Sequence, residues 1–116
     1  MAISEHAANS QTVGTTEHSL TTDTAGPDVD TTDGVYQVFI DFNALADGDV
    51  FEVKFYEKVQ SSDTQRCFWT AAVAHDQGAC ENWVSPSMVL MHGWDVTLEK
   101  LSGTDRAITW SVRKVA

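Results

Sequence analysis

The feature that most constrains the fold is a succession of short stretches in which apolar and polar residues alternate, from residue 35 onward. In VYQVFIDF (35–42), Tyr36, Val38 and Ile40 share one face. A period of two is typical of β-strands buried on one side. The same kind of stretch recurs over residues 50–59, 66–75, 82–91, 93–101 and 107–115.

No segment longer than two turns has the period of an amphipathic helix. About six or seven short strands in succession predict an all-β fold, an antiparallel β-sandwich with jelly-roll or Ig-like connectivity. Asp47-Gly48 predicts a hairpin between the first two of these strands. Pro86 interrupts the stretch 82–91, which therefore belongs at an edge or a bend.

The composition changes near Gly34. Before it, single apolar residues are separated by Ser, Thr, Asn, Gln and Asp, and TTDTAGPDVDTTDG (21–34) has no basic residue. Such a stretch cannot build a core of its own. We therefore expect residues 1–33 to be an extended acidic arm and residues 34–116 to be the β-sandwich domain.

Acidic and basic residues, like apolar residues, are distributed unevenly along the chain. The net charge is −10, and residues 1–53 hold ten acidic residues and no Lys or Arg, whereas the rest of the chain is balanced. Nucleic-acid binding needs clustered Lys and Arg, which are missing, so we expect no nucleic-acid partner. A basic protein surface is the more plausible partner.

The opening MAISEHAANS has neither the basic nor the apolar region of a secretory signal, and no apolar run is long enough to span a membrane. We expect a protein made in the cytoplasm, with no membrane partner. Thiols in such a protein are more often free than bridged, although pairing of Cys67 with Cys80 stays open. Cys67 alternates with Trp69 on an apolar face and is interpreted as a core residue.

Candidate chemistry is sparse. Asp28, Asp30 and Asp33 precede Gly34 and offer oxygen ligands for Ca²⁺, but their spacing does not match an EF-hand. The zinc-type residues lack paired spacing, so we expect no metal and no cofactor; they are Cys67, His75, Cys80 and His92. Neither a nucleophile elbow nor a phosphate-binding loop is present, and we expect no enzyme activity.

The tryptophans point to one further function to consider, carbohydrate binding, because indole rings can stack on sugars. Three of the four tryptophans share strand faces with aliphatic residues and are expected in the core; these are Trp69, Trp94 and Trp110. Trp83, beside Asn82 and ahead of Pro86, is the one expected to contact a ligand or a subunit.

Three stretches carry a resemblance: TTDGVYQVFIDFNALADGDVFEVKFYEKV, DTQRCFWTA and MHGWDVTLEKLSGTDRAITWSVRKVA. Over nearly its whole length the chain resembles small virion proteins of tailed bacteriophages, and it is most similar to head decoration (cement) proteins. The resemblance implies a β-domain with an arm, bound to the outer surface of the phage head. It also implies the major capsid protein or another virion protein as partner, and a homo-oligomer, trimer or dimer. Cys67 and Cys80 depart from what we expect of such proteins.

On this interpretation the arm binds the shell through apolar anchors and acidic charge partners, and Trp83 adds a contact on the domain. The expected contact residues are Ile3, Val13, Leu20 and Val29 as anchors, and Asp28, Asp30 and Asp33 as charge partners. Two alternatives stay open: a tail, neck or head-fibre attachment protein of the virion, and a carbohydrate-binding β-sandwich module.

Overall fold

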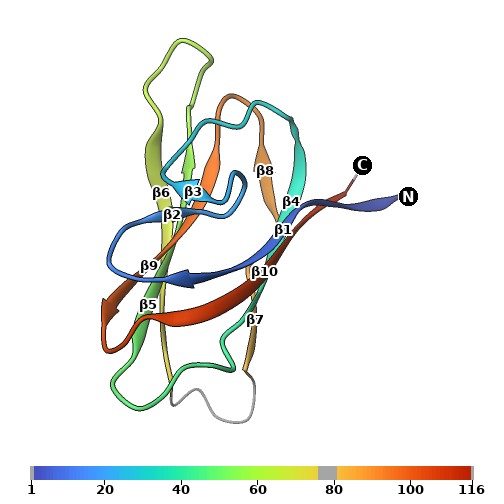
Figure 1. The fold of residues 1–116 in the computed structure, drawn as a ribbon. Helices are drawn as coiled ribbons and strands as arrows, with labels where there is room; N and C mark the ends of the chain where they lie inside the picture. The colour runs from blue at the N-terminus through green and yellow to red at the C-terminus, as the bar shows by residue number, and fades with distance from the viewer. Residues whose placement is uncertain (1, 76–80, 116) are drawn as a thin grey trace.

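The computed structural model describes residues 2–75 and 81–115, which form strands and loops and no helix. Two antiparallel sheets lie face to face, as the alternating pattern predicted (Figure 1). None of the described residues belongs to a helix that could cross a membrane. The strands are β1 (Ile3–Val13), β2 (His18–Ser19), β3 (Thr24–Ala25), β4 (Gly34–Asp41), β5 (Val50–Glu57), β6 (Arg66–Ala74), β7 (Asn82–Val84), β8 (Met88–Leu90), β9 (Asp95–Ser102) and β10 (Arg106–Val115).

Strands from both ends of the chain build each sheet. Sheet A has the order β1-β10-β4-β7, and β8 also pairs with β4. Sheet B has the order β3-β2-β9-β5-β6. The break expected at Pro86 is confirmed, because β7 and β8 pair with successive parts of β4 on either side of it.

The turn at Asp47-Gly48 does not close a hairpin, and this prediction was wrong. It joins β4 of sheet A to β5 of sheet B, which do not pair. The loop is instead fixed by Asp49, whose carboxylate accepts hydrogen bonds from the backbone N–H groups of Ala46 (2.8 Å) and Thr104 (2.9 Å). A turn of this composition therefore predicts that the chain reverses, but it does not predict which sheet the next strand joins.

The core lies between the sheets and is filled from the inner faces of β4, β5, β9 and β10. The alternation predicted these faces correctly, because alternate residues are apolar through most of each strand, as Ile108, Trp110 and Val112 are in β10. Fully buried members include Val38, Phe55, Trp94, Leu98 and Val112.

The expected separate arm is the main correction. Residues 3–13 form β1, the edge strand of sheet A, which pairs with β10 from Ile3 opposite Val115 to Val13 opposite Arg106, with a β-bulge at His6. Val13 and Leu20 belong to the core. Residues 2–33 are thus part of the sandwich, and Gly34 is not a domain boundary in this fold.

The polar composition of this region has a structural reason. Inward-facing Asn9 and Gln11 of β1 donate hydrogen bonds of 2.6 and 3.0 Å to the carboxylate of Asp23, and His18 lies 2.7 Å from the same group. Hydrogen bonds from Gln11, and next from His18, lower the pKa of Asp23. Residues 14–33, here called the 14–33 segment, therefore cover the β1 edge of the sandwich by polar contacts rather than by an apolar stripe.

Cys67 is exposed, which corrects its interpretation as a core residue. A β-bulge in the β5–β6 pairing places Trp69 opposite Phe55 but Cys67 opposite Tyr56, leaving Phe68 between them. The bulge shifts the alternation by one residue, so Cys67 turns away from the core.

Candidate functional site

The outer face of sheet A carries four rows of side chains that cross its strands. The register of β1, β10, β4 and β7/β8 places these side chains side by side, and their exposure alternates with the core residues. The rows are Ser10–Thr109–Asp41–Asn82, then Ala8–Ser111–Phe39–Val84, then Glu5–Arg113–Gln37, and last Ile3–Val115–Val35–Val89. The first and third rows are polar, whereas the last is wholly aliphatic.

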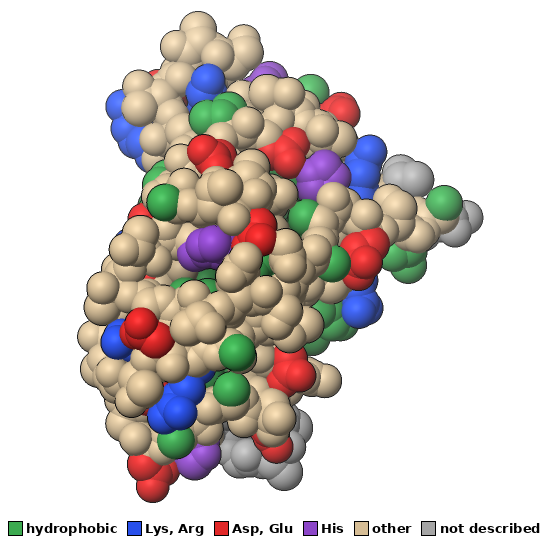
Figure 2. All heavy atoms as spheres, viewed as in Figure 1, with side chains coloured by type: hydrophobic (Ala, Val, Ile, Leu, Met, Phe, Trp, Pro, Cys, Tyr) green, Lys and Arg blue, Asp and Glu red, His purple; other side chains and the backbone are tan. Residues whose placement is uncertain are grey.

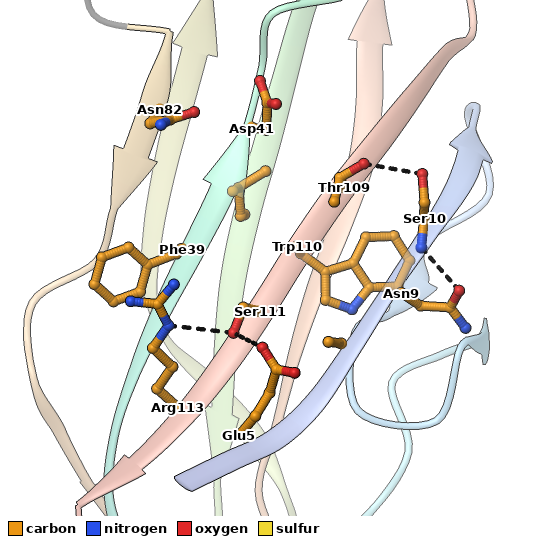
Figure 3. A pocket seen from close by; sticks show the side chains of 12 residues that line it. Glu5, Asn9, Ser10, Phe39, Asp41, Asn82, Thr109, Trp110, Ser111 and Arg113 are labelled. Atoms are coloured by element: carbon orange, nitrogen blue, oxygen red, sulfur yellow. Dashed lines mark hydrogen bonds between the residues drawn. The ribbon is translucent and has the colours of Figure 1, made fainter. Parts of the chain in front are cut away.

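A shallow groove of about 600 Å³ runs over the first three rows, and we call it the sheet A groove. Its walls come from β1, β10, β4 and β7, so residues from both ends of the chain and from its middle meet there (Figure 3). The volume is within the ~300–1,000 Å³ usual for ligand sites. Most of its lining residues carry hydroxyl, amide or charged groups, but apolar atoms supply most of the surface that faces the groove, as in other ligand sites.

Arg113 is the most constrained charged group in the groove. Its guanidinium lies over the ring of Phe39 at 3.8 Å from the ring centre, a cation–π contact. Its Nε donates to Ser111 Oγ (3.3 Å), and that hydroxyl donates to Glu5 Oε2 (2.6 Å) (Figure 3). The first two contacts orient the guanidinium plane at the groove wall, and the third orients the Ser111 hydroxyl.

Further along, the groove presents hydroxyl and amide groups. Ser10 Oγ and Thr109 Oγ1 share a hydrogen bond of 2.9 Å, and Ser10 N–H donates to the side chain of Asn9. Asp41 and Asn82 face each other across β4 and β7. The groove therefore offers both hydrogen-bond donors and hydrogen-bond acceptors to a ligand.

A second surface lies at one end of the sandwich. Three segments meet there: Gln65 Nε2 donates to Asp28 O (2.7 Å), and the N–H groups of Met91 and His92 donate to Glu57. Half of the exposed large hydrophobic residues of the described chain lie on these segments or on β8 next to them. We call this surface the apolar end; its residues are Val29 (55% exposed), Val59 (81%), Val89 (81%) and Met91 (53%).

The structure divides the expected apolar anchors into two pairs. Ile3 is exposed at the start of β1 and Val29 is exposed in the apolar end. Val13 and Leu20 are 1% exposed in the core of their own chain, so the expectation that they anchor a partner is wrong. Both backbone groups of Leu20 are hydrogen-bonded: its N–H donates to Val96 O and its carbonyl accepts from Trp110 Nε1.

The expected charge partners are mostly engaged within the chain. Asp28 accepts hydrogen bonds from the hydroxyls of Thr22 and Thr24, and Asp30 lies 2.7 Å from His6 Nε2. Asp33 is exposed. Acidic side chains are spread over the face seen in Figure 2 rather than gathered in one patch. Of the three, Asp33 is the best placed to meet a basic partner.

Trp83 packs against the core instead of presenting an exposed platform. Its ring lies 6.0 Å from that of Trp69 and 6.5 Å from that of Phe42. The aromatic residue on the outer face is Phe39, which the sequence reasoning missed. The available signal was its position in β4 between outward-facing Gln37 and Asp41.

Metal-type residues do not converge in residues 2–75 and 81–115, where no group of three or more could hold an ion. Cys67 is a free thiol. Cys80, which the zinc and disulfide interpretations both require, lies outside the described residues.

Comparison of the chain with models of known protein families, with curated proteins and with solved structures finds no match. The geometry thus leaves two surfaces to explain, the sheet A groove and the apolar end.

Proposed function

We propose that the chain is a structural virion protein of a tailed phage, a decoration protein that binds the outside of the head through its apolar end. The observation that carries the proposal is that Val29, Val59 and Met91 are exposed on segments held together by hydrogen bonds, with exposed Val89 on β8 next to them. Exposed apolar residues grouped in this way mark protein–protein contact surfaces. The resemblance to head decoration proteins supplies the kind of partner.

The strand order supports the assignment to a jelly roll. If β7 and β8 count as one interrupted strand and two-residue β3 is set aside, sheet A contains the first, eighth, third and sixth strands. Sheet B then contains the second, seventh, fourth and fifth. Two sheets of eight strands with jelly-roll connections are found in viral capsid and lectin domains. Fold alone does not determine function, so the apolar end remains the main support.

The proposed mechanism stabilises the shell by adding buried apolar area at many equivalent sites. Each contact is modest, but a dimer or trimer engaging several capsid subunits at once binds through multivalency. Exposed Asp33, beside the apolar end, meets basic residues of the major capsid protein. Attachment through this end leaves the sheet A groove open to solvent.

The test uses phage heads that lack this protein. Wild-type protein should sediment with such heads, and Val89→Asp and Met91→Asp should reduce the bound fraction by about tenfold or more, because each buries a charge in the contact. Leu101→Asp is the matched control, since Leu101 is 51% exposed on β9 outside the apolar end. Wild-type binding by both apolar-end variants, or equal loss with Leu101→Asp, would contradict the proposal.

A second candidate is a tail, neck or head-fibre attachment protein. It is favoured by the position of the apolar end, which is built largely from loops at the ends of strands rather than from a sheet face. Isolated tails included in the same sedimentation assay separate the two: binding to tails and not to heads would replace the first proposal with this one.

A further inference from the structure

We propose that the sheet A groove binds a neutral glycan, an activity separate from attachment to the shell. The groove lies over the rows from Glu5–Arg113 to Ser10–Asn82. Three of the four apolar-end residues lie in loops, and the fourth, Val89, lies in the last row of sheet A, outside the groove lining. One chain can therefore hold a virion partner and a sugar ligand at the same time.

The hydrogen-bonding groups of the groove match those of a polyhydroxylated ligand. A sugar hydroxyl both donates and accepts hydrogen bonds. The groove supplies carboxylate acceptors in Glu5 and Asp41, guanidinium donors in Arg113, and groups of both kinds in Asn82 and Thr109. These groups are spread over four strands, so a chain of linked sugars can meet several of them in turn.

Arg113 is preorganised to bind such a ligand. Stacking on Phe39 and the bond to Ser111 use one face and one N–H of the guanidinium. A guanidinium has five N–H donors in a planar fork. The remaining donors can bind two neighbouring hydroxyls of one sugar without a further loss of side-chain freedom, which lowers the cost of binding.

The charge and the strand pairing of the groove disfavour other ligand classes. Two carboxylates against one guanidinium make the groove negative, and the protein carries a net charge of −10, so anionic polymers are repelled. The groove floor is formed by β4 and β10, whose backbone groups are paired on both sides, so an extended peptide finds no free strand edge there. A wholly apolar ligand would cover the apolar part of the lining but leave groups such as those of Asp41, Asn82 and Arg113 without hydrogen-bond partners. A neutral glycan satisfies all three conditions.

The test begins with the intact protein on an array of neutral hexasaccharides of glucose, mannose and N-acetylglucosamine, with heparin hexasaccharide as the anionic probe. We expect binding to at least one neutral glycan and none to heparin. In two-dimensional NMR of labelled protein, that glycan should shift the amide signals of Phe39, Thr109 and Ser111 and leave those of Val29 and Met91 unchanged.

Two substitutions test the assigned residues. Arg113→Lys keeps the charge but removes the planar fork, and Asp41→Asn keeps the shape but removes a charged acceptor; each should weaken binding by about tenfold. Arg66→Lys is the matched control, because Arg66 is exposed on sheet B, and it should bind as wild type. Circular dichroism checks that each variant is folded.

Three results would overturn the proposal: no binding to any neutral glycan, a preference for heparin, or wild-type binding by Arg113→Lys and Asp41→Asn together. Binding of phage heads by the two variants shows whether glycan binding and attachment to the head are separate activities. It should equal that of wild type, since neither residue belongs to the apolar end, and a parallel loss of head binding would show that the groove is part of the virion contact instead.

Discussion

The carboxylate of Asp95, which is fully buried at the start of β9, accepts a hydrogen bond of 2.7 Å from the backbone N–H of Asp28. The same carboxylate accepts from Ser19 Oγ at 3.0 Å and from Thr21 Oγ1 at 2.7 Å. One side chain thereby fastens three points of the 14–33 segment to sheet B. The hydroxyls of the segment bind this carboxylate, and they also bind acids of the segment itself, as Thr22 and Thr24 bind Asp28.

Asp95→Asn is expected to destabilise the fold. Burial raises the pKa of Asp95, so its charge has a cost, but an amide replaces one acceptor oxygen with a donor. With its oxygen toward the Asp28 N–H, the amide would place an NH2 where the hydroxyls of Ser19 and Thr21 now donate. Both hydroxyls would have to turn and accept instead, and we expect a loss of about 1–3 kcal/mol in the free energy of unfolding. Urea unfolding measures it, with exposed Asp33→Asn as the control. Equal stability of Asp95→Asn and wild type would show that relief of the buried charge is the larger effect.

Leu20→Ala tests whether the N-terminal region belongs to the core. Leu20 is 1% exposed, so truncation should lower the free energy of unfolding by about 2–5 kcal/mol. Ile3, at 67% exposure, should tolerate Ile3→Ala with a change within about 0.5 kcal/mol. Similar small effects at both positions would restore the idea of an independent arm.

Deletion of residues 1–13 should unfold the chain or leave it partly folded. It removes β1, frees the edge of β10 along its whole length, and takes away Asn9 and Gln11, which bind Asp23. Proton NMR of the truncated protein should lose the dispersed amide signals of a β-fold. A well-dispersed spectrum would instead mean that sheet A is stable without its first strand.

Local alternation predicted the strands because it depends on neighbours in the sequence, and in β4 and β5 every second residue is apolar. It could not predict the arrangement of strands, since β1 pairs with β10 at the other end of the chain. It also misjudged β1, where inward-facing Asn9 and Gln11 bind Asp23 and so produce the pattern of an exposed segment.

The candidate site was predictable only in part, for the same reason. The alternation of β4 already turns Phe39 outward among polar neighbours, and the position of Arg113 in the last strand is outward too. That the two side chains touch depends on the register between β10 and β4, in which Ser111 lies opposite Phe39. Such a register follows from the packed sheet, not from either strand alone.

The bulge in β6 makes a prediction about thiol reactivity. Cys67 is exposed, so in a Cys80→Ser background it should react with a thiol reagent in the folded protein about as fast as in urea. A buried core cysteine would react only after unfolding. Strong protection of Cys67 in the native protein would mean that the bulge is absent and that the strand alternates regularly through Trp69.

Acid should destabilise the protein through Asp49, which is 2% exposed at the β4–β5 turn. Hydrogen bonds from the backbone N–H groups of Ala46 and Thr104, and next from the guanidinium of Arg106 at 2.6 Å, lower the pKa of Asp49 from 3.8 to about 2. Since the folded pKa is below the unfolded value, the stabilisation is complete above about pH 4 and is lost as the pH falls toward 2. Thermal unfolding of wild type and Asp49→Asn across this range provides the measurement. The difference in Tm between them should be largest at neutral pH and shrink on acidification; a difference that stays constant from neutral pH to pH 2 would show that Asp49 acts by shape alone.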